Sequence, residues 1–365
     1  MSNVIVVVNK ELELRDYRMQ MALNGLCRIA MPTSKEYGDF IIPVRLTGGV
    51  SFSEDITGLY DLVRLILRNR GACFHFFSSK YYVLGPILSK IFSRASKVVI
   101  TVNGLGRLAL NQDSFLFSIF KKLLGLSLRN TDYVIFQNES DQSFFLKSFK
   151  KKFSPDSDSD NNPFGYSVIY SFVKTEKEQL NNYFIDASFD GASKPIVLYV
   201  GRQVLDKGID KFYDLANVAF DDYDFHIIGE APVDSKLKVR LEQLINQGVL
   251  TWDGYCSNVY PHIDKALCVI VPSDREGLPR VIIEAYSRGK PVIGFDVPGV
   301  SEFIVNGVTG YISNEKTHEG LLECLKKLNS KEERFFKENT RVYFEENFSE
   351  LKFLHKMEKI YSRFR

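Results

Sequence analysis

Two glutamates in the second half of the chain carry the clearest chemical signal. Glu276 follows an apolar run, 267–272, that predicts a buried strand. Because proline is favoured in the first turn of a helix, Pro279 predicts a helix that carries Glu284 about one turn from its start. Gly277 would let the backbone approach a ligand closely. Carboxylates so placed can bind hydroxyl groups on two parts of one ligand, although Glu-x7-Glu also arises by chance in solvated loops and helices.

Two cations follow another predicted strand, over 196–200. Gly201 and Arg202 close this strand, and Lys207 opens the helix after it. A guanidinium and an ammonium group beside a helix N-terminus are typical of a site that neutralises a diphosphate. Asp206 lies between the two cations, so a surface ion pair is the alternative. The position directly after a strand favours the anion site.

These residues lie in a chain with two successive regions, each of which alternates strands and helices. Such alternation predicts an α/β protein with two Rossmann-like, doubly wound domains that face each other across a cleft, with the ligand in that cleft. We expect a first domain over 1–175, a polar linker over 176–194 and a second domain over 195–345. The segment 346–365 is amphipathic, and we expect it to form a C-terminal helix that packs back toward the first domain.

Composition excludes several classes of protein. The 365 residues carry a net charge of only +2, so no overall positive field favours nucleic acid. Five cysteines without CxxC spacing favour reduced thiols in a cytoplasmic protein over zinc ligands. No stretch reaches the ~18 uncharged apolar residues of a membrane span, and the short N-terminal apolar run predicts a first strand, not a signal peptide.

A glycine-containing loop follows the strand predicted over 97–102. The loop begins with Asn103, and Gly104, Gly106 and Ala109 formally match GxGxxA, with Arg107 inside the pattern. The match is a weak dinucleotide signal because no convincing helix begins at the second glycine. We expect a tight loop that contacts some ligand, and a simple turn is the alternative.

Three basic segments of the first half, 90–97, 121–129 and 147–152, are interleaved with Phe and Leu. Ordinary core helices with solvated lysines would explain them. A basic, aromatic face that lies on an anionic bilayer is the sharper hypothesis.

The second half resembles the sugar-nucleotide-binding domain of the retaining GT-B glycosyltransferases of glycosyltransferase family 4. The matching pieces are YVGRQVLDKGIDKF, VPSDREGLPRVIIEA, GKPVIGFDVPG and NGVTGYI. The first half is similar, more weakly, to the bacterial subgroup that builds lipid-linked O-antigen, capsule and related glycans. The pieces that carry this second likeness are HFFSSKYYVLG, TVNGLGR and VIFQNESD.

The resemblance implies a role for each matching residue. Arg202 and Lys207 would bind the donor diphosphate, Glu276 the donor sugar and Glu284 the ribose, with Glu276, Arg202 and Lys207 as the catalytic group. The remaining donor-binding candidates are Gly201, Gly277, Leu278 and Pro279. The acceptor-side candidates are Arg18, Lys80, Asn103, Gly104 and Arg107. Asn9 and Lys10 replace the family's usual Gly-Gly pair, and Asn103 stands in the loop that often supplies a histidine.

The function that the resemblance implies is transfer of one sugar, with retention of configuration, from a nucleotide diphosphate sugar such as a UDP-sugar to a glycan acceptor. The acceptor would be lipid-linked, at the cytoplasmic face of the inner membrane, in bacterial surface polysaccharide synthesis. We expect no metal and no cofactor. The alternatives are a sugar-nucleotide epimerase of the same architecture, a soluble transferase of glycogen or sucrose type, and a non-catalytic partner in a polysaccharide complex.

Overall fold

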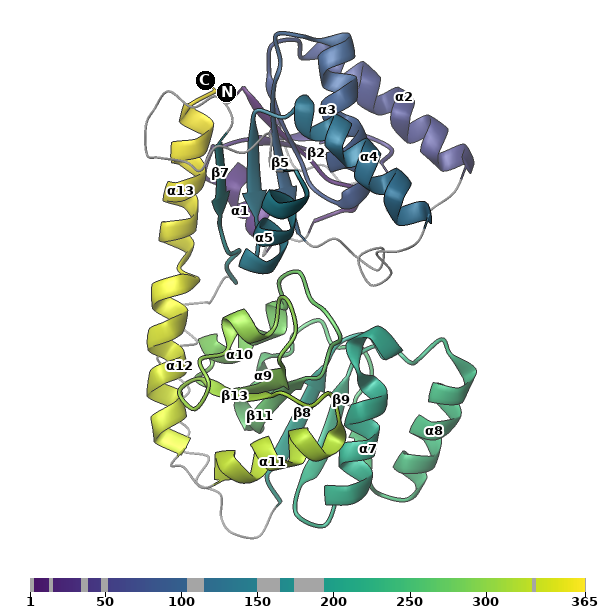
Figure 1. Ribbon diagram of the computed structural model, residues 1–365, viewed down its shortest axis with the longest axis vertical. Helices are drawn as coiled ribbons and strands as arrows, with labels where there is room; N and C mark the ends of the chain where they lie inside the picture. Colours follow the sequence, from purple (N-terminus) through teal and green to yellow (C-terminus); the bar gives the residue numbers. More distant parts are fainter. Residues whose placement is uncertain are drawn as a thin grey trace. The chain divides into compact units, whose positions relative to one another are not determined.

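The chain forms two compact units in the computed structural model (Figure 1). One unit contains Met1–Lys174 together with Glu350–Arg365, and the other contains Thr175–Ser349. The structure describes residues 3–12, 16–33, 39–46, 52–103, 115–149, 165–173, 194–329 and 333–364. Of the predicted linker 176–194, only Lys194 is among them.

The first unit is built on seven parallel strands in the order β3-β2-β1-β4-β5-β6-β7. The strands are β1 (Val4–Val7), β2 (Arg28–Met31), β3 (Ile41–Pro43), β4 (Cys73–Phe76), β5 (Lys97–Val102), β6 (Tyr133–Phe136) and β7 (Gly165–Val168). The central strands are apolar throughout because both faces of the sheet are covered by helices. The strand order reverses between β1 and β4, which makes the carboxyl ends of these two strands the natural place for a ligand.

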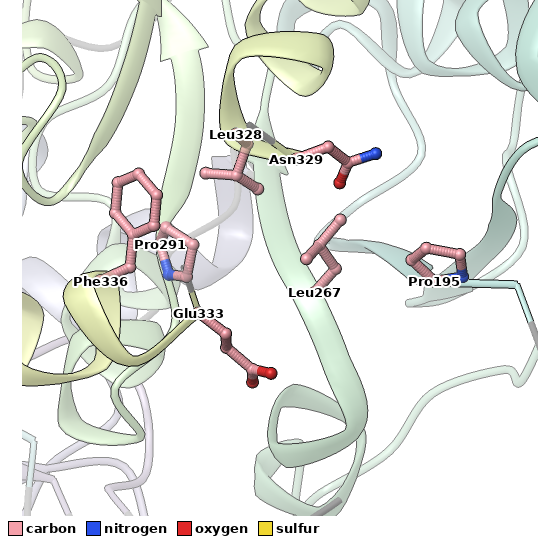
Figure 2. Close-up of a pocket in the computed structure, with 7 residues that line it drawn as sticks. All are labelled: Pro195, Leu267, Pro291, Leu328, Asn329, Glu333 and Phe336. Carbon is pink, nitrogen blue, oxygen red and sulfur yellow. The ribbon is translucent and has the colours of Figure 1, made fainter. Parts of the chain in front are cut away.

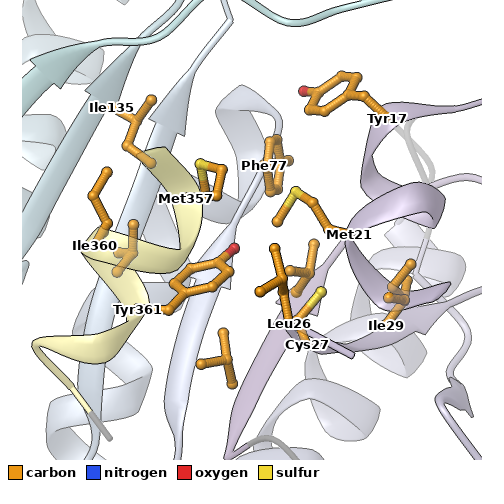
Figure 3. Packing of buried hydrophobic residues seen from close by; sticks show 14 of the residues in the cluster. Tyr17, Met21, Leu26, Cys27, Ile29, Phe77, Ile135, Met357, Ile360 and Tyr361 are labelled. Carbon is orange, nitrogen blue, oxygen red and sulfur yellow. The ribbon is translucent and has the colours of Figure 1, made fainter. Parts of the chain in front are cut away.

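Helices cover both faces of this sheet. One face carries α2 (Phe52–Arg68), α3 (Ser79–Phe92), α4 (Phe115–Arg129) and α5 (Glu139–Ser148), and the other carries α1 (Tyr17–Leu23) and α13 (Glu350–Ser362). Successive strand residues point to opposite faces, so Ile5 lies in the cluster under α2 to α5 and Val6 in the cluster under α1 and α13. Figure 3 shows the second of these clusters.

The last helix of the chain completes the core of the first unit. The α13 residues Met357, Ile360 and Tyr361 are buried against β-strand residues such as Ile135 (Figure 3). The Tyr361 hydroxyl lies 2.6 Å from Nδ1 of His75, whose Nε2 lies 2.7 Å from the hydroxyl of Thr101 on β5. Burial, together with the positive charge of Arg18, lowers the pKa of His75 to about 3, so the imidazole is neutral in the folded protein.

The second unit repeats the arrangement with six parallel strands in the order β10-β9-β8-β11-β12-β13. The strands are β8 (Ile196–Val200), β9 (Asp224–Ile228), β10 (Leu250–Trp252), β11 (Ala266–Val271), β12 (Val292–Phe295) and β13 (Gly310–Ser313). The helices are η2 (Leu205–Lys207), α7 (Ile209–Ala219), α8 (Ser235–Asn246), α9 (Tyr260–Lys265), α10 (Arg280–Ser287), η3 (Ser301–Phe303), α11 (His318–Asn329) and α12 (Glu333–Asn347). The order reverses between β8 and β11.

Two doubly wound parallel sheets confirm the predicted fold class of two Rossmann-like domains. The cleft between the domains stays a prediction. The helix predicted at Pro279 is present as α10, which begins one residue later, at Arg280, with Pro279 as its N-cap.

The neutral imidazole of His75 makes a testable contribution to stability. In the unfolded chain a histidine titrates near pH 6.5, so below that pH the unfolded state binds a proton that the folded state does not. The free energy of unfolding should therefore fall with decreasing pH, by about 1.4 kcal/mol per unit from this residue. Guanidinium chloride unfolding between pH 7 and pH 5 should show a shallower slope for His75→Asn. The same substitution at the exposed His355 of α13 is the control, and equal slopes in all three proteins would contradict the assignment.

Candidate functional site

The strand-order reversal of the second sheet brings the predicted cations and carboxylate together. β8 and β11 are neighbours in the sheet, so the loops after their carboxyl ends meet. Lys207 ends η2 after β8, and Glu276 lies in the loop after β11. The Lys207 ammonium donates a hydrogen bond of 2.6 Å to Oε2 of Glu276. The side chains are only 22% and 15% exposed, so the pair is partly shielded from water.

The second carboxylate oxygen of Glu276 is also engaged. Ser273, which is buried, donates its hydroxyl proton to Oε1 of Glu276 over 2.7 Å. The backbone N–H of Glu276 donates to the carbonyl of Pro298 at 3.1 Å. The carboxylate is thus oriented from two sides. Ser273 was not among the sequence-predicted residues, because a serine between a strand and a loop is common in any fold.

Two glycines make this geometry possible. Gly208 has φ +67°, and a Cβ there would lie 1.8 Å from the carbonyl oxygen of Pro272. Gly299 has φ +76°, and its Cβ would lie 2.0 Å from the carbonyl oxygen of Glu276. Both positions combine a left-handed backbone with a close approach that only glycine permits. The backbone N–H of Asp274 also donates to the carbonyl of Asp206 at 3.2 Å, which ties the β11 loop to the β8 loop.

Hydrogen bonds from two buried side chains fix the backbone around Arg202. The buried Tyr199 donates its hydroxyl proton to the carbonyl of Arg202 at 2.8 Å. Burial raises the pKa of Tyr199, and the negative charge of Glu276 raises it further, so this phenol keeps its proton. The next residue, Gln203, is buried and donates to the carbonyl of Glu230 at 2.9 Å. Arg202 itself is exposed, just after the carboxyl end of β8.

The remaining donor-side candidates lie at the start of α10. Pro279 is buried, and Gly277 and Leu278 are half-buried in the loop before the helix. Glu284 is half-buried on α10, where its carbonyl accepts a hydrogen bond of 2.7 Å from the Ser287 hydroxyl. Glu284 therefore stands one helical turn behind the loop that holds Glu276, as the spacing predicted.

Of the acceptor-side candidates of the first unit, two form local ion pairs, one is exposed and two lie outside the described residues. Arg18 on α1 is buried, and its Nε and Nη2 donate to the two carboxylate oxygens of Asp16 at 2.9 and 2.7 Å. Lys80 on α3 forms an ion pair with Asp55. Asn103 is exposed at the end of β5. Gly104 and Arg107 lie outside the described residues.

One residue that sequence reasoning missed stands at the strand-order reversal of the first sheet. Ser78 precedes α3 at the carboxyl end of β4 with φ +69°, the left-handed region that L residues rarely adopt. Its hydroxyl oxygen is buried and makes no hydrogen bond to the described residues. Backbone strain of this kind concentrates at functional sites. The only signal for Ser78 in the sequence is that two consecutive serines stand between a predicted strand and a predicted helix.

The basic segments differ in how their charges are used. Lys90 and Lys97 both pair with Asp132, at 3.1 and 3.6 Å. On α4, by contrast, Lys121 and Lys122 are exposed. Beside them on α4 lie the exposed apolar residues Phe115, Ile119, Leu123 and Leu126. Residues 150–152 lie outside the described residues. No described helix has the length and apolar character needed to cross a bilayer.

A cavity of about 210 Å³ lies at the opposite end of the second sheet (Figure 2). Pro195, Leu267 and Pro291, at the amino ends of β8, β11 and β12, line it together with Leu328 and Phe336. It contains none of the predicted site residues and is separated from Glu276 by the length of the strands. Among the residues that the structure describes, no group of three or more His, Cys, Asp or Glu side chains is placed to bind a metal.

Comparison with known protein families agrees with this geometry. Residues 185–349, which include the Lys207–Glu276 pair, match the family described as glycosyl transferases group 1. Residues 32–138 match the family described as glycosyl transferase 4-like. The two matches fall on different units and together take in most of the chain. The chain belongs to the glycosyltransferases that combine these two domains.

Two curated glycosyltransferases resemble the chain over more than half of its length. It is 27% identical over 240 residues to the N,N'-diacetylbacillosaminyl-diphospho-undecaprenol alpha-1,3-N-acetylgalactosaminyltransferase of Campylobacter jejuni, a match that covers 61% of this chain and 58% of that protein. It is 25% identical over 311 residues to the UDP-Gal:alpha-D-GlcNAc-diphosphoundecaprenol alpha-1,3-galactosyltransferase of Escherichia coli, with 80% and 76% of the two chains covered.

Solved structures that resemble the chain over its length share its GT-B fold. A sucrose-phosphate synthase from Thermosynechococcus elongatus matches with a TM-score of 0.76 and 19% identity over 100% of this chain and 99% of that one. WaaG, a glycosyltransferase involved in lipopolysaccharide biosynthesis, matches with a TM-score of 0.71 and 14% identity over 98% and 99%. At these identities the likeness establishes the fold alone.

The close approach of Gly299 to Glu276 can be tested without any ligand. Gly299→Ala should lower the free energy of unfolding by several kcal/mol, since a Cβ would meet a carbonyl oxygen at 2.0 Å in a strained backbone. Gly248→Ala is the matched control, because Gly248 has a similar φ of +70° and no atom within 4 Å of its Cβ. This control should cost only about 1 kcal/mol. Thermal and denaturant unfolding of the two variants would measure the difference, and equal losses would show that the Glu276 loop is not pinned.

Proposed function

We propose that the protein is a retaining glycosyltransferase that moves one sugar from a nucleotide diphosphate sugar to a lipid-linked glycan acceptor in bacterial surface polysaccharide synthesis. The observation that carries this proposal is the Lys207–Glu276 pair at the strand-order reversal of the second sheet. The pair places a cation, which can bind phosphate, beside a carboxylate, which can bind hydroxyl groups. Such a site fits a ligand that contains both phosphate and hydroxyl groups. A sugar nucleotide is such a molecule.

The donor would bind with its diphosphate toward Arg202 and Lys207. A diphosphate carries more negative charge than one carboxylate, so it would draw the Lys207 ammonium into a shared position between itself and Glu276. Glu276 would then accept hydrogen bonds from the sugar hydroxyls while Ser273 continues to orient its other oxygen. Glu284, one turn behind the loop on α10, would accept from the ribose hydroxyls.

The chemistry proposed is front-face substitution at the anomeric carbon. The bond from that carbon to the diphosphate oxygen breaks, and a bond to the acceptor oxygen forms on the same face. The acceptor's hydroxyl proton passes to the departing phosphate oxygen, so no protein base is required. Arg202 and Lys207 stabilise the negative charge that develops on the phosphate. In this scheme the two cations fill the place of a metal ion, and no cofactor takes part.

Glu276 is poorly suited to be a base or a nucleophile in this scheme. Both of its oxygens already accept hydrogen bonds, one from the Ser273 hydroxyl and one from the Lys207 ammonium, so neither oxygen is free to take a proton or attack a carbon. A retaining hydrolase would instead need two carboxylates about 5 Å apart across the scissile bond. These contacts support a role for Glu276 in holding the donor sugar.

The relatives support the choice of donor and acceptor. The Campylobacter and Escherichia coli proteins are named as transferases that act on sugars carried by diphosphoundecaprenol, and the second uses UDP-Gal. We infer a UDP-sugar donor and a polyprenyl diphosphate-linked acceptor for this chain. An epimerase is less well supported because the named relatives are transferases.

A lipid-linked acceptor requires contact with a bilayer surface. The exposed Phe115, Ile119 and Leu123 of α4, with Lys121 and Lys122 beside them, support peripheral contact with an anionic membrane. We propose that this contact takes place at the cytoplasmic face of the inner membrane.

Replacing Glu276 tests the transfer reaction. Glu276→Ala should reduce the rate of sugar transfer by about 100-fold or more, because the variant cannot hold the donor sugar in the transition state. UDP binding should stay within a few-fold, since Lys207 remains. UDP release from UDP-sugars, measured with and without a polyprenyl diphosphate-linked acceptor, gives the rate, and dependence on the acceptor distinguishes transfer from epimerisation. The exposed Glu323→Ala on α11 is the control. Full activity of Glu276→Ala would refute the assignment.

Replacing Lys207 tests the diphosphate site. Lys207→Ala should weaken UDP binding by about tenfold or more and leave uridine binding unchanged, because the ammonium contacts phosphate and not the nucleoside. Lys211→Ala removes the same charge from α7, where Lys211 pairs with Asp210. Isothermal titration of both variants with UDP and uridine would decide. A loss that is equal for UDP and uridine would place Lys207 elsewhere in the site.

A further inference from the structure

An open groove of about 450 Å³ runs between α2 and the edge of the first sheet, away from every residue assigned so far. Three arginines, Arg45, Arg64 and Arg68, line it together with Asp61, Thr33 and Asn69. All of these lie in the first unit, in the described part of the chain. Three guanidinium groups against one carboxylate leave two net positive charges in a single groove.

One of the arginines is neutralised inside the groove. Nε and Nη2 of Arg45 donate to the two oxygens of Asp61 at 2.9 and 3.0 Å, and the Arg45 backbone N–H donates to the same carboxylate at 3.0 Å. These hydrogen bonds, together with the positive charges of Arg45 and Arg64, hold the pKa of the Asp61 carboxyl below its usual range, so Asp61 is charged.

The other two arginines supply the net charge. Arg64 and Arg68 lie four residues apart on α2, hence on the same side of the helix, and both are exposed. Neither forms a hydrogen bond or an ion pair with another residue in the described part of the chain. Next to the groove, Arg28 donates to the side-chain oxygen of the lining residue Asn69 at 3.1 Å, and the buried Nε of Arg28 has no hydrogen-bond partner among the described residues. The groove is thus rich in unused donors.

The outer side of α2 carries apolar residues beside these arginines. Ile56, Tyr60 and Leu67 are 53%, 60% and 39% exposed and repeat at helical spacing along one stripe. Arg64 and Arg68 border this stripe on the side of the groove. An exposed apolar stripe bordered by arginines is typical of a helix that lies in a bilayer interface, with its cations at the level of the headgroups. α2 lies in the same helical layer as α4 (Figure 1).

We propose that the α2 groove binds a phosphate ester at the surface of a bilayer, with Arg64 and Arg68 as its ligands. A guanidinium group can donate paired hydrogen bonds to phosphate oxygens. Two guanidinium groups one helical turn apart are better suited to bind a phosphate or diphosphate than to bind a single carboxylate. The inference rests on the proposed function in one respect, because a lipid-linked acceptor carries such a diphosphate. A phospholipid headgroup presents the same chemistry.

The experiment compares binding of the full chain to three kinds of vesicle by cosedimentation. The vesicles are phosphatidylcholine alone, phosphatidylcholine with phosphatidylglycerol, and phosphatidylcholine with a polyprenyl diphosphate. Arg64→Gln/Arg68→Gln should weaken binding to the vesicles that carry anionic phosphate by about tenfold or more. Arg70→Gln, just after α2 and outside the groove, should stay within twofold. Lys326→Gln/Lys327→Gln on α11 removes the same net charge far along the chain and should also stay within twofold.

The outcomes separate the sources of the phosphate and separate this proposal from the previous one. Preferential binding to the polyprenyl diphosphate vesicles would identify the acceptor, and equal binding to both anionic vesicles would identify a headgroup. Unchanged vesicle binding by the double variant would overturn the proposal, as would an equal loss in the charge-matched control. Displacement from the groove by soluble pyrophosphate with no vesicle binding at all would overturn the membrane source. UDP titration of the double variant should match the wild type, so failure of the donor site would appear in Lys207→Ala and not here.

Discussion

The close approach of two loops after β8 and β11 is the constraint on which the site of the second domain depends. The backbone at Gly208 passes so near the carbonyl of Pro272 that no side chain fits between them. That approach carries the ammonium of Lys207 to the carboxylate of Glu276 in a partly shielded position. Removing either partner of this half-buried ion pair would leave the other charge without compensation, so Lys207 and Glu276 depend on each other.

The two sheets have the same strand order and use their strand ends differently. In the second domain, hydrogen bonds from Tyr199 and Gln203 to backbone carbonyls fix the chain after β8, and Arg202 is exposed there. In the first domain, the charged residues nearest the reversal are neutralised locally, Arg18 by Asp16 and Lys80 by Asp55. Arg64 and Arg68, which form no ion pair in the described part of the chain, lie instead along α2, near the edge of the sheet.

The fold and the pairing of regions at the candidate site could be predicted from the sequence, because both depend on local patterns. Parallel strands covered on both faces give continuous apolar runs, and Lys207 and Glu276 each lie in the loop region after such a run. The supports of the site could not be predicted in this way. Gln203 donates to a carbonyl 27 residues away in the sequence. Ser273 orients the carboxylate of Glu276, and this contact is visible only in the folded structure. The burial of Arg18 was equally hidden, since Tyr17 beside it packs on Phe353 from the far end of the chain.

The position of α13 has a consequence for how the protein is made. The second domain has all of its residues by Ser349, whereas the first lacks Met357, Ile360 and Tyr361 until after the second domain has been made. The hydroxyl partner of His75 is among these late residues. The usual order of synthesis, in which the N-terminal domain finishes folding first, is thereby reversed. The nascent first domain has an uncovered apolar face on its sheet until α13 has emerged from the ribosome.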